Sequence, residues 1–157
     1  MILVALGTQD KQFYRLLKII ENAIKKGIIK DNVVVQSGTT EFKSDLMDIR
    51  SFIPSDELEK LVNEADLVVC HGGVGIITNS LRKSKKVFAM PRLKMYKEHR
   101  NDHQVQLVEK FSRLGYIKEI HDYDDFVREY KNINKFKPKK VKFDNSKILE
   151  IVSNFIG

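Results

Sequence analysis

The sequence is poor in the residues that cross-link a fold or carry it through a membrane. Its 157 residues include one cysteine, Cys70, so an intramolecular disulfide is impossible and a zinc cluster built on several cysteines is excluded. The longest uninterrupted apolar run extends from Met1 to Leu6, far below the ~20 residues that a membrane-spanning helix requires. No charged region precedes this run, so we expect no signal peptide and a cytoplasmic or cytoplasm-facing protein.

Basic charge is what the sequence has in excess. Lys and Arg number 28 against 21 Asp and Glu, which gives a formal net charge of +7, and 42% of the residues are hydrophobic. This length and composition fit one globular domain and exclude a mainly disordered chain, a collagen and a disulfide scaffold. The charge favours anionic partners such as nucleic acid, acidic lipid headgroups or phosphorylated small molecules, although a lysine-rich solvated surface explains it more simply.

Short apolar runs alternate with segments of helical periodicity. The run Ile2–Leu6 is continuously apolar, as in a strand buried on both faces. Further strands are predicted at Val33–Gln36, Ile49–Ile53, Leu67–Cys70, Val87–Met90 and Tyr116–Ile120. Helices are predicted at Lys11–Lys26, Pro54–Asn63, from the glycines after His71 to Ser84, and at Asn101–Leu114, Asp122–Tyr130 and Ser146–Phe155. This alternation predicts an α/β fold with a Rossmann-like parallel sheet flanked by helices.

One segment has a biased composition, because lysines crowd around Pro138. They are Lys131, Lys135, Lys137, Lys139, Lys140 and Lys142. We predict that residues 1–130 form one α/β domain, that 131–143 form an exposed lysine-rich linker, and that 144–157 form a C-terminal helix. The apolar face of that helix suits either docking to a partner or packing on its own domain.

Three predicted strand ends carry residues suited to ligand binding, which occurs at the carboxyl edge of open parallel sheets. They are Gly7-Thr8-Gln9, His71 to Gly75, and the segment that begins at Pro91. The glycines at 72, 73 and 75 would let a phosphate approach a helix start closely. The loop lacks the Lys-Ser/Thr of a Walker A motif and does not match the dinucleotide-binding fingerprint. On glycines alone, a phosphate site and a tight structural turn are nearly equal interpretations.

His71 and the polar residues after Pro91 make the prediction of a ligand site at this edge of the sheet more specific. His71 could donate to a phosphate oxygen or be satisfied by a neighbouring carbonyl, and both interpretations stay open. Four basic residues suit phosphates: Arg92, Lys94, Lys97 and Arg100. Asp102, His103 and Gln104 suit the hydroxyls of a sugar, although Asp102 also suits a helix N-terminus. His99 and His103 are four residues apart, but no third ligand stands at matching spacing, so no metal site is predicted.

Three sequence blocks together resemble a known family. They are Gly7-Thr8-Gln9, Ala65-Asp66-Leu67-Val68-Val69-Cys70-His71-Gly72-Gly73-Val74-Gly75, and Pro91-Arg92 through Glu98-His99 to Asp102-His103-Gln104. They resemble the C-terminal, donor-binding domain of glycosyltransferase family 28. More narrowly, the chain is similar to small split-enzyme subunits such as the soluble subunit of the dolichol-linked UDP-N-acetylglucosamine transferase and those of bacterial capsule and exopolysaccharide clusters.

The resemblance implies one half of a GT-B enzyme, which transfers a sugar from a nucleotide donor with inversion and without a metal or other cofactor. By similarity, His71 and the glycine loop lie at the donor diphosphate, the next helix reaches the ribose, and Asp102 to Gln104 contact the sugar. The implied donor-binding residues are Gly7, Thr8, Gln9, His71, Gly72, Gly73, Val74, Gly75, Asn79, Arg92, Asp102, His103 and Gln104. Glu98 and His99 are the candidate catalytic residues, and a partner could supply the base instead.

The helix after the glycine loop departs from the family pattern. Ile76 stands where a serine is usual, and Asn79 where a ribose-binding glutamate is usual. The usual Gly-Lys-Pro before the next strand is replaced by Ser84-Lys85-Lys86. These changes leave a shifted donor preference, weaker binding and a subunit without catalysis all open.

The leading hypothesis is a hexosyltransferase subunit that is active only with a partner. It would bind UDP-galactose or UDP-N-acetylglucosamine and transfer the sugar to a polyprenyl-diphosphate-linked acceptor in capsule or exopolysaccharide biosynthesis. A membrane-anchored subunit would hold it at the inner face of the membrane. The alternative is a non-catalytic enhancer or scaffold subunit of such a transferase. A nucleic-acid-binding domain is least favoured, because no aromatic interleaving or reading element accompanies the charge.

Overall fold

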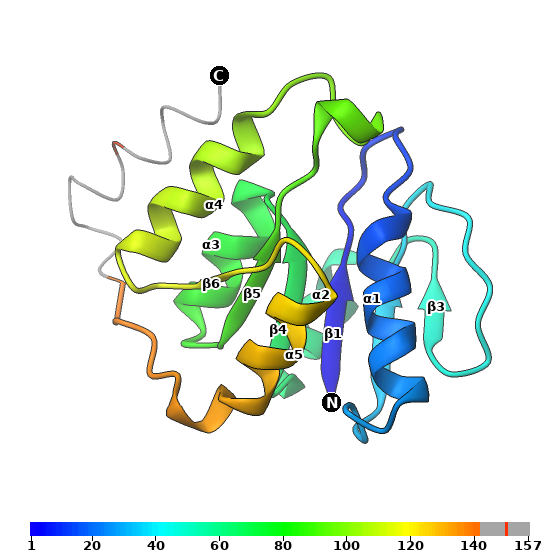
Figure 1. Cartoon of the computed structure of the whole chain (residues 1–157), viewed down its shortest axis with the longest axis horizontal. Coiled ribbons are helices and arrows are strands. Elements are labelled where there is room, and N and C mark those ends of the chain that lie inside the picture. The colour runs from blue at the N-terminus through cyan, green and yellow to red at the C-terminus, as the bar shows by residue number, and fades with distance from the viewer. Residues whose placement is uncertain (142–149, 151–157) are drawn as a thin grey trace.

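A six-stranded parallel sheet with helices on both faces organises the chain in this computed structural model, which describes residues 1–141 and residue 150 (Figure 1). The strands are β1 (Ile2–Ala5), β2 (Val33–Gln36), β3 (Asp48–Arg50), β4 (Leu67–His71), β5 (Val87–Met90) and β6 (Lys118–Glu119), in the sheet order β3-β2-β1-β4-β5-β6. The helices are α1 (Tyr14–Lys25), α2 (Ser55–Glu64), α3 (Val74–Arg82), α4 (His103–Arg113) and α5 (Tyr123–Lys131), with short 3₁₀ helices η1 (Lys94–Tyr96) and η2 (Ile133–Lys135). The predicted Rossmann-like fold is confirmed.

The sheet separates two apolar cores, because successive side chains of a strand point to opposite faces. In β1, Ile2 and Val4 pack with apolar residues of α1 and α5, whereas Leu3 and Ala5 pack with those of α2, α3 and α4. Strands buried on both faces are therefore continuously apolar, as the sequence indicated. The order of the strands reverses between β1 and β4, which is where ligands of open α/β sheets bind.

Several predicted elements are shorter in the structure. The first helix begins at Tyr14 rather than Lys11, and the backbone of Phe13 before it is not helical. The Phe13 N–H donates to Thr40 Oγ1 at 3.0 Å. The third strand ends at Arg50, and Ile53 packs in the core from the following loop. The predicted helix at Asn101 begins at His103. The predicted terminal helix lies outside the described residues except for residue 150.

The lysine-rich segment follows α5 closely and stays against the domain. Lys131 is the last residue of α5, and Phe136 is buried, with its ring centroid 6.5 Å from that of Phe88. Further on, the Lys139 N–H donates to the Gly115 carbonyl at 3.0 Å. The lysine side chains at 135, 137, 139 and 140 are exposed, as expected. The division into domain, linker and terminal helix stays a prediction.

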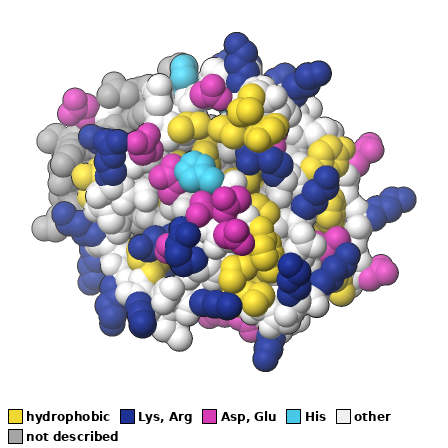
Figure 2. Space-filling model, viewed as in Figure 1, with side chains coloured by type: hydrophobic (Ala, Val, Ile, Leu, Met, Phe, Trp, Pro, Cys, Tyr) yellow, Lys and Arg dark blue, Asp and Glu magenta, His cyan; other side chains and the backbone are white. Residues whose placement is uncertain are grey.

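On one face of the molecule (Figure 2), the basic charge is distributed rather than gathered into one patch. On the face shown in Figure 2, Lys and Arg side chains are spread around the outline of the molecule, with Asp and Glu among them. Within residues 1–141 and residue 150, no helix is long and apolar enough to cross a membrane.

Candidate functional site

The loops that follow β1, β4 and β5 surround a cavity of about 340 Å³ at the carboxyl edge of the sheet. It is lined by Gln9, Gly72, Gly73, Val74, His99, Arg100, Asn101, His103, Gln104 and Leu107. A smaller hollow of about 280 Å³ continues beside it along Gln9, Asp10, Lys11, His99 and Arg100. The structure thus brings seven of the predicted site residues to this cavity: Gln9, Gly72, Gly73, Val74, His99, His103 and Gln104.

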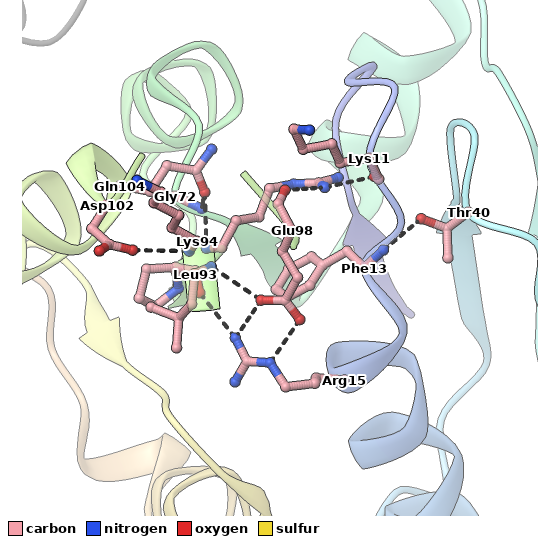
Figure 3. A network of polar contacts seen from close by, with 12 residues as sticks. Lys11, Phe13, Arg15, Thr40, Gly72, Leu93, Lys94, Glu98, Asp102 and Gln104 are labelled. Atoms are coloured by element: carbon pink, nitrogen blue, oxygen red, sulfur yellow. Dashed lines mark hydrogen bonds and ion pairs between the residues drawn. The ribbon is translucent and has the colours of Figure 1, made fainter. Parts of the chain in front are cut away.

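One side chain, Gln104, joins the ends of β4 and β5. Its Oε1 accepts from the Gly72 N–H at 3.0 Å (Figure 3) and from the Arg92 N–H at 3.1 Å. Its Nε2 lies 3.2 Å from His71 Nδ1. Because Oε1 is fixed as the acceptor of two backbone donors, Nε2 must be the donor to the imidazole. Gln104 is buried, so its first role is to set the shape of the glycine loop.

His71 is a neutral imidazole that carries its proton on Nε2. Burial, and then the positive charge of Arg92, lower its pKa to about 3. Since Nδ1 accepts from Gln104, the proton of the neutral ring is on Nε2. Nε2 lies 2.5 Å from the point where a Cβ on either Gly7 or Gly73 would stand. The ring therefore needs glycine at both positions, and it presents its N–H to the loop without carrying a charge.

Replacing Gly73 with alanine is expected to destabilise the fold by roughly 1–3 kcal/mol, because the new Cβ would overlap the imidazole that Gln104 holds in place. Gly75 is the matched control: it lies in α3, and nothing lies within 4 Å of a Cβ added there. Gly75→Ala should stabilise the helix by about 0.5–1 kcal/mol. Urea unfolding of both variants measures the difference, and equal effects would contradict the packing of His71 against Gly73.

Arg92 is the most deeply buried charged residue among those described. Its side chain is 1% exposed, and it donates to the carbonyls of Lys11 at 2.8 Å, of Glu98 at 3.1 Å and of Leu6. Burial lowers its pKa to about 10, so the guanidinium stays charged at neutral pH. These hydrogen bonds tie the end of β1 to the β5–α4 segment. This geometry favours a structural role over the predicted donor contact.

Glu98 is likewise engaged by the protein itself. Its two carboxylate oxygens accept from Arg15 Nε and Nη2, each at 2.7 Å, and Oε1 also accepts from the Leu93 N–H at 3.0 Å (Figure 3). The whole Glu98 residue is 3% exposed. This pair fastens α1 to the β5–α4 segment, so the geometry favours a clamp over the predicted catalytic role. Sequence reasoning missed Arg15, because nothing in its helical surroundings marks it.

His99 lies in the wall between the two hollows. Burial, and then the charges of Arg92 and Arg100, lower its pKa, so the ring is neutral at pH 7. Its Nδ1 accepts from the Asn101 N–H at 3.3 Å, which leaves the other nitrogen protonated. To act as a base, the ring would have to give up this hydrogen bond.

The remaining predicted residues lie at the margin of the site. The first turn of α3, from Val74, has no side-chain cap, so its N–H groups are available beside the cavity. Asn79 is farther along α3, where its Oδ1 accepts from Lys83 Nζ at 3.2 Å. Asp102 is exposed, and its Oδ1 accepts from the Lys94 N–H at 2.9 Å. Thr8 is exposed on the loop after β1.

Among the described residues, no three His, Cys, Asp or Glu side chains are placed to hold a metal ion.

The sheet order, the glycine loop after β4 and the polar cavity beside it define a Rossmann-like domain of the type found in GT-B glycosyltransferases. The family model of the glycosyltransferase family 28 C-terminal domain matches residues 1–153, so the chain belongs to this family. This confirms the resemblance that the sequence blocks indicated.

Individual relatives agree with this assignment. The UDP-N-acetylglucosamine transferase subunit ALG13 of Candida albicans is 26% identical over 115 residues, which are 70% of this chain and 38% of that protein. An NMR structure of ALG13 matches 99% of this chain and 96% of its own, with a TM-score of 0.60 and 16% identity. MurG of Acinetobacter baumannii matches 96% of this chain and 43% of its own, with a TM-score of 0.56 and 16% identity. At these identities the solved structures show the fold alone.

Proposed function

We propose that this chain is the donor-binding subunit of a glycosyltransferase and that it binds a UDP-sugar in the cavity at the ends of β4 and β5. One observation supports the proposal most directly. In a chain of family 28, one cavity is surrounded by the Gly72-Gly73 loop, the uncapped start of α3 and the His99–Gln104 segment. The relative of 26% identity is called a UDP-N-acetylglucosamine transferase subunit, which supports a UDP-sugar and a partner subunit.

The diphosphate of the donor would lie at the start of α3. Free backbone N–H groups and the positive end of the helix dipole attract an anion there, and glycine allows its close approach. The Nε2–H of His71 faces the same loop and would donate a neutral hydrogen bond to a phosphate oxygen. Arg100 lines the cavity and would add positive charge. The same donors would stabilise the charge that builds up on UDP as it leaves.

The sugar would lie toward the start of α4, where His103 and Gln104 line the cavity. In the reaction, a hydroxyl oxygen of the acceptor attacks the anomeric carbon, the bond from that carbon to UDP breaks, and the hydroxyl proton passes to a base. We place the base either at His99 or on a partner. The transfer inverts the anomeric centre and requires no metal.

The partner and acceptor complete the proposal. The chain spans 38% of the length of its Candida albicans relative and 43% of MurG. Because that relative is called a transferase subunit, we assign the acceptor site to a second, membrane-anchored subunit. The acceptor is a polyprenyl-diphosphate-linked sugar of capsule or exopolysaccharide biosynthesis, and the donor is UDP-galactose or UDP-N-acetylglucosamine. The complex would work at the inner face of the membrane.

Replacing His71 with alanine is expected to weaken UDP binding by about 1–3 kcal/mol, because one hydrogen bond to a phosphate oxygen is lost. Titration calorimetry on the chain, alone and with its partner, measures this effect. The control is His121→Ala, which removes an exposed histidine whose Nε2 lies 2.9 Å from Glu119 on the β6–α5 side. Unchanged affinity in a folded His71→Ala protein would remove the imidazole from the donor site.

Two residues of α3 favour the alternative, a non-catalytic subunit. Ile76 packs against the apolar core rather than offering a hydroxyl, and the Asn79 amide is engaged with Lys83. The same titration separates the two functions. UDP binding by the chain that the isolated partner does not show supports the donor-binding subunit, whereas UDP binding by the isolated partner and not by the chain supports an enhancer or scaffold.

A further inference from the structure

The tip of the segment between β5 and α4 exposes large apolar side chains. The 3₁₀ helix η1 carries Met95, which is 75% exposed, and Tyr96, which is 53% exposed. Within the part of the chain that the structure describes, only Phe52 among the other large apolar residues is exposed to a similar extent, at 59%. Large apolar side chains that face water side by side are typical of a contact surface.

Basic residues surround this tip. Lys94, Lys97 and Arg100 are exposed, whereas Glu98 points inward and is paired with an arginine of α1. The exposed carboxylate of the segment, Asp102, accepts a hydrogen bond from the backbone of Lys94. Figure 2 shows hydrophobic side chains together with Lys and Arg side chains toward its upper edge, where Figure 1 places the β5–α4 connection. The tip thus combines an apolar pair with a positive rim.

The tip is also held in shape by the protein. The Lys97 N–H donates to the Lys94 carbonyl at 2.9 Å, and the Glu98 N–H donates to the Leu93 carbonyl at 3.1 Å. The Arg15 guanidinium lies 4.7 Å from the centroid of the Tyr96 ring. Because these contacts already order the backbone, binding at the tip would cost little conformational entropy.

We propose that this tip, residues 94–97, docks on the headgroup region of an anionic lipid bilayer. Met95 and Tyr96 enter the interface, where an aromatic ring with a polar end is well accommodated, and Lys94 and Lys97 contact lipid phosphates. His99 and Arg100 follow directly in the chain, so docking would hold the cavity close to the bilayer surface. This contact is made by the chain itself, and it does not depend on the proposed sugar transfer or on a partner subunit.

The chain contains no tryptophan, so one introduced residue reports on a single position. Met95→Trp is expected to shift its fluorescence to shorter wavelength with vesicles of phosphatidylcholine and phosphatidylglycerol, and to be quenched by brominated acyl chains. Phe52→Trp is the matched control, because Phe52 is similarly exposed on the loop after β3. A shift confined to Met95→Trp supports the proposal. No shift, equal shifts at both positions, or a shift that requires a protein partner would overturn it.

Charge variants separate this contact from general attraction of a basic protein. In the otherwise unchanged chain, Lys94→Gln with Lys97→Gln should lower partition onto the anionic vesicles by roughly fivefold for each lysine. The control pair, Lys137→Gln with Lys139→Gln, removes the same charge from exposed lysines on the segment after η2. A clearly larger loss for the first pair supports the proposal, and equal losses would show nonspecific attraction and overturn it.

Discussion

Replacing Arg92 with leucine is expected to lower the free energy of unfolding by about 3–5 kcal/mol, a large share of the 5–15 kcal/mol that stabilises a typical domain. The side chain is 1% exposed, and its guanidinium satisfies the carbonyls of Leu6, Lys11 and Glu98. Leucine would leave all three acceptors without this donor in a site closed to water. Arg92→Lys should also be harmful, because one ammonium group cannot reproduce the planar fork of donors.

Urea unfolding followed by circular dichroism measures this loss. Arg100→Leu is the control, since it removes an exposed arginine from the same segment and should change stability by no more than about 0.5 kcal/mol. If Arg92→Leu were as stable as Arg100→Leu, the connection that Arg92 makes between the end of β1 and the β5–α4 segment would contribute nothing to stability.

Lowering the pH from 7 to about 4.5 is expected to destabilise the native chain through His71 by an amount on the order of a few kcal/mol. Burial lowers the pKa of His71 to about 3 in the fold, whereas an unfolded histidine titrates near 6.5. Between these values the unfolded chain binds a proton that the native chain does not. Stability therefore rises with pH in this window, and His71 costs nothing above pH 6.5, where both states are neutral.

His71→Asn tests this origin, because an asparagine oxygen can accept from Gln104 much as Nδ1 does but does not titrate. Chemical unfolding between pH 7 and 4.5 should show a smaller slope of stability against pH in this variant. His99, whose pKa is also lowered by burial, leaves a residual slope of the same sign. His103→Gln is the control on an exposed residue. A slope that is identical in His71→Asn and the parent would contradict the burial of a neutral His71.

Periodicity predicted the fold because the signals that specify it are local. Apolar runs such as Val33–Gln36 identify strands that are covered on both faces, and Gly27 has the positive φ of +74° that ends a helix. The ends of elements were less predictable because contacts from distant residues decide them. At the start of α1, for example, the Phe13 N–H donates to the hydroxyl of Thr40, 27 residues away.

The sequence predicted where the candidate site lies, but not the role of each residue in it. The carboxyl ends of β1, β4 and β5 had to meet once the sheet order was fixed, so the glycine loop and the His99–Gln104 segment share a cavity. Whether a polar residue faces the cavity or supports it depends on partners that the sequence does not reveal. Arg92 was predicted to bind the donor and Glu98 to take part in catalysis, and the structure buries both of them against the protein.

The Arg15–Glu98 clamp has a consequence for how sequences with this fold can change. A buried carboxylate that has lost its arginine destabilises the fold more than an apolar residue in its place. Replacing one member of the pair alone is therefore expected to lower stability more than replacing both. The two positions are 83 residues apart in the sequence, yet their side chains are in direct contact. Related chains are expected to keep the pair or to replace it as a whole, and the covariation of these positions would record the attachment of α1 to the edge of the site.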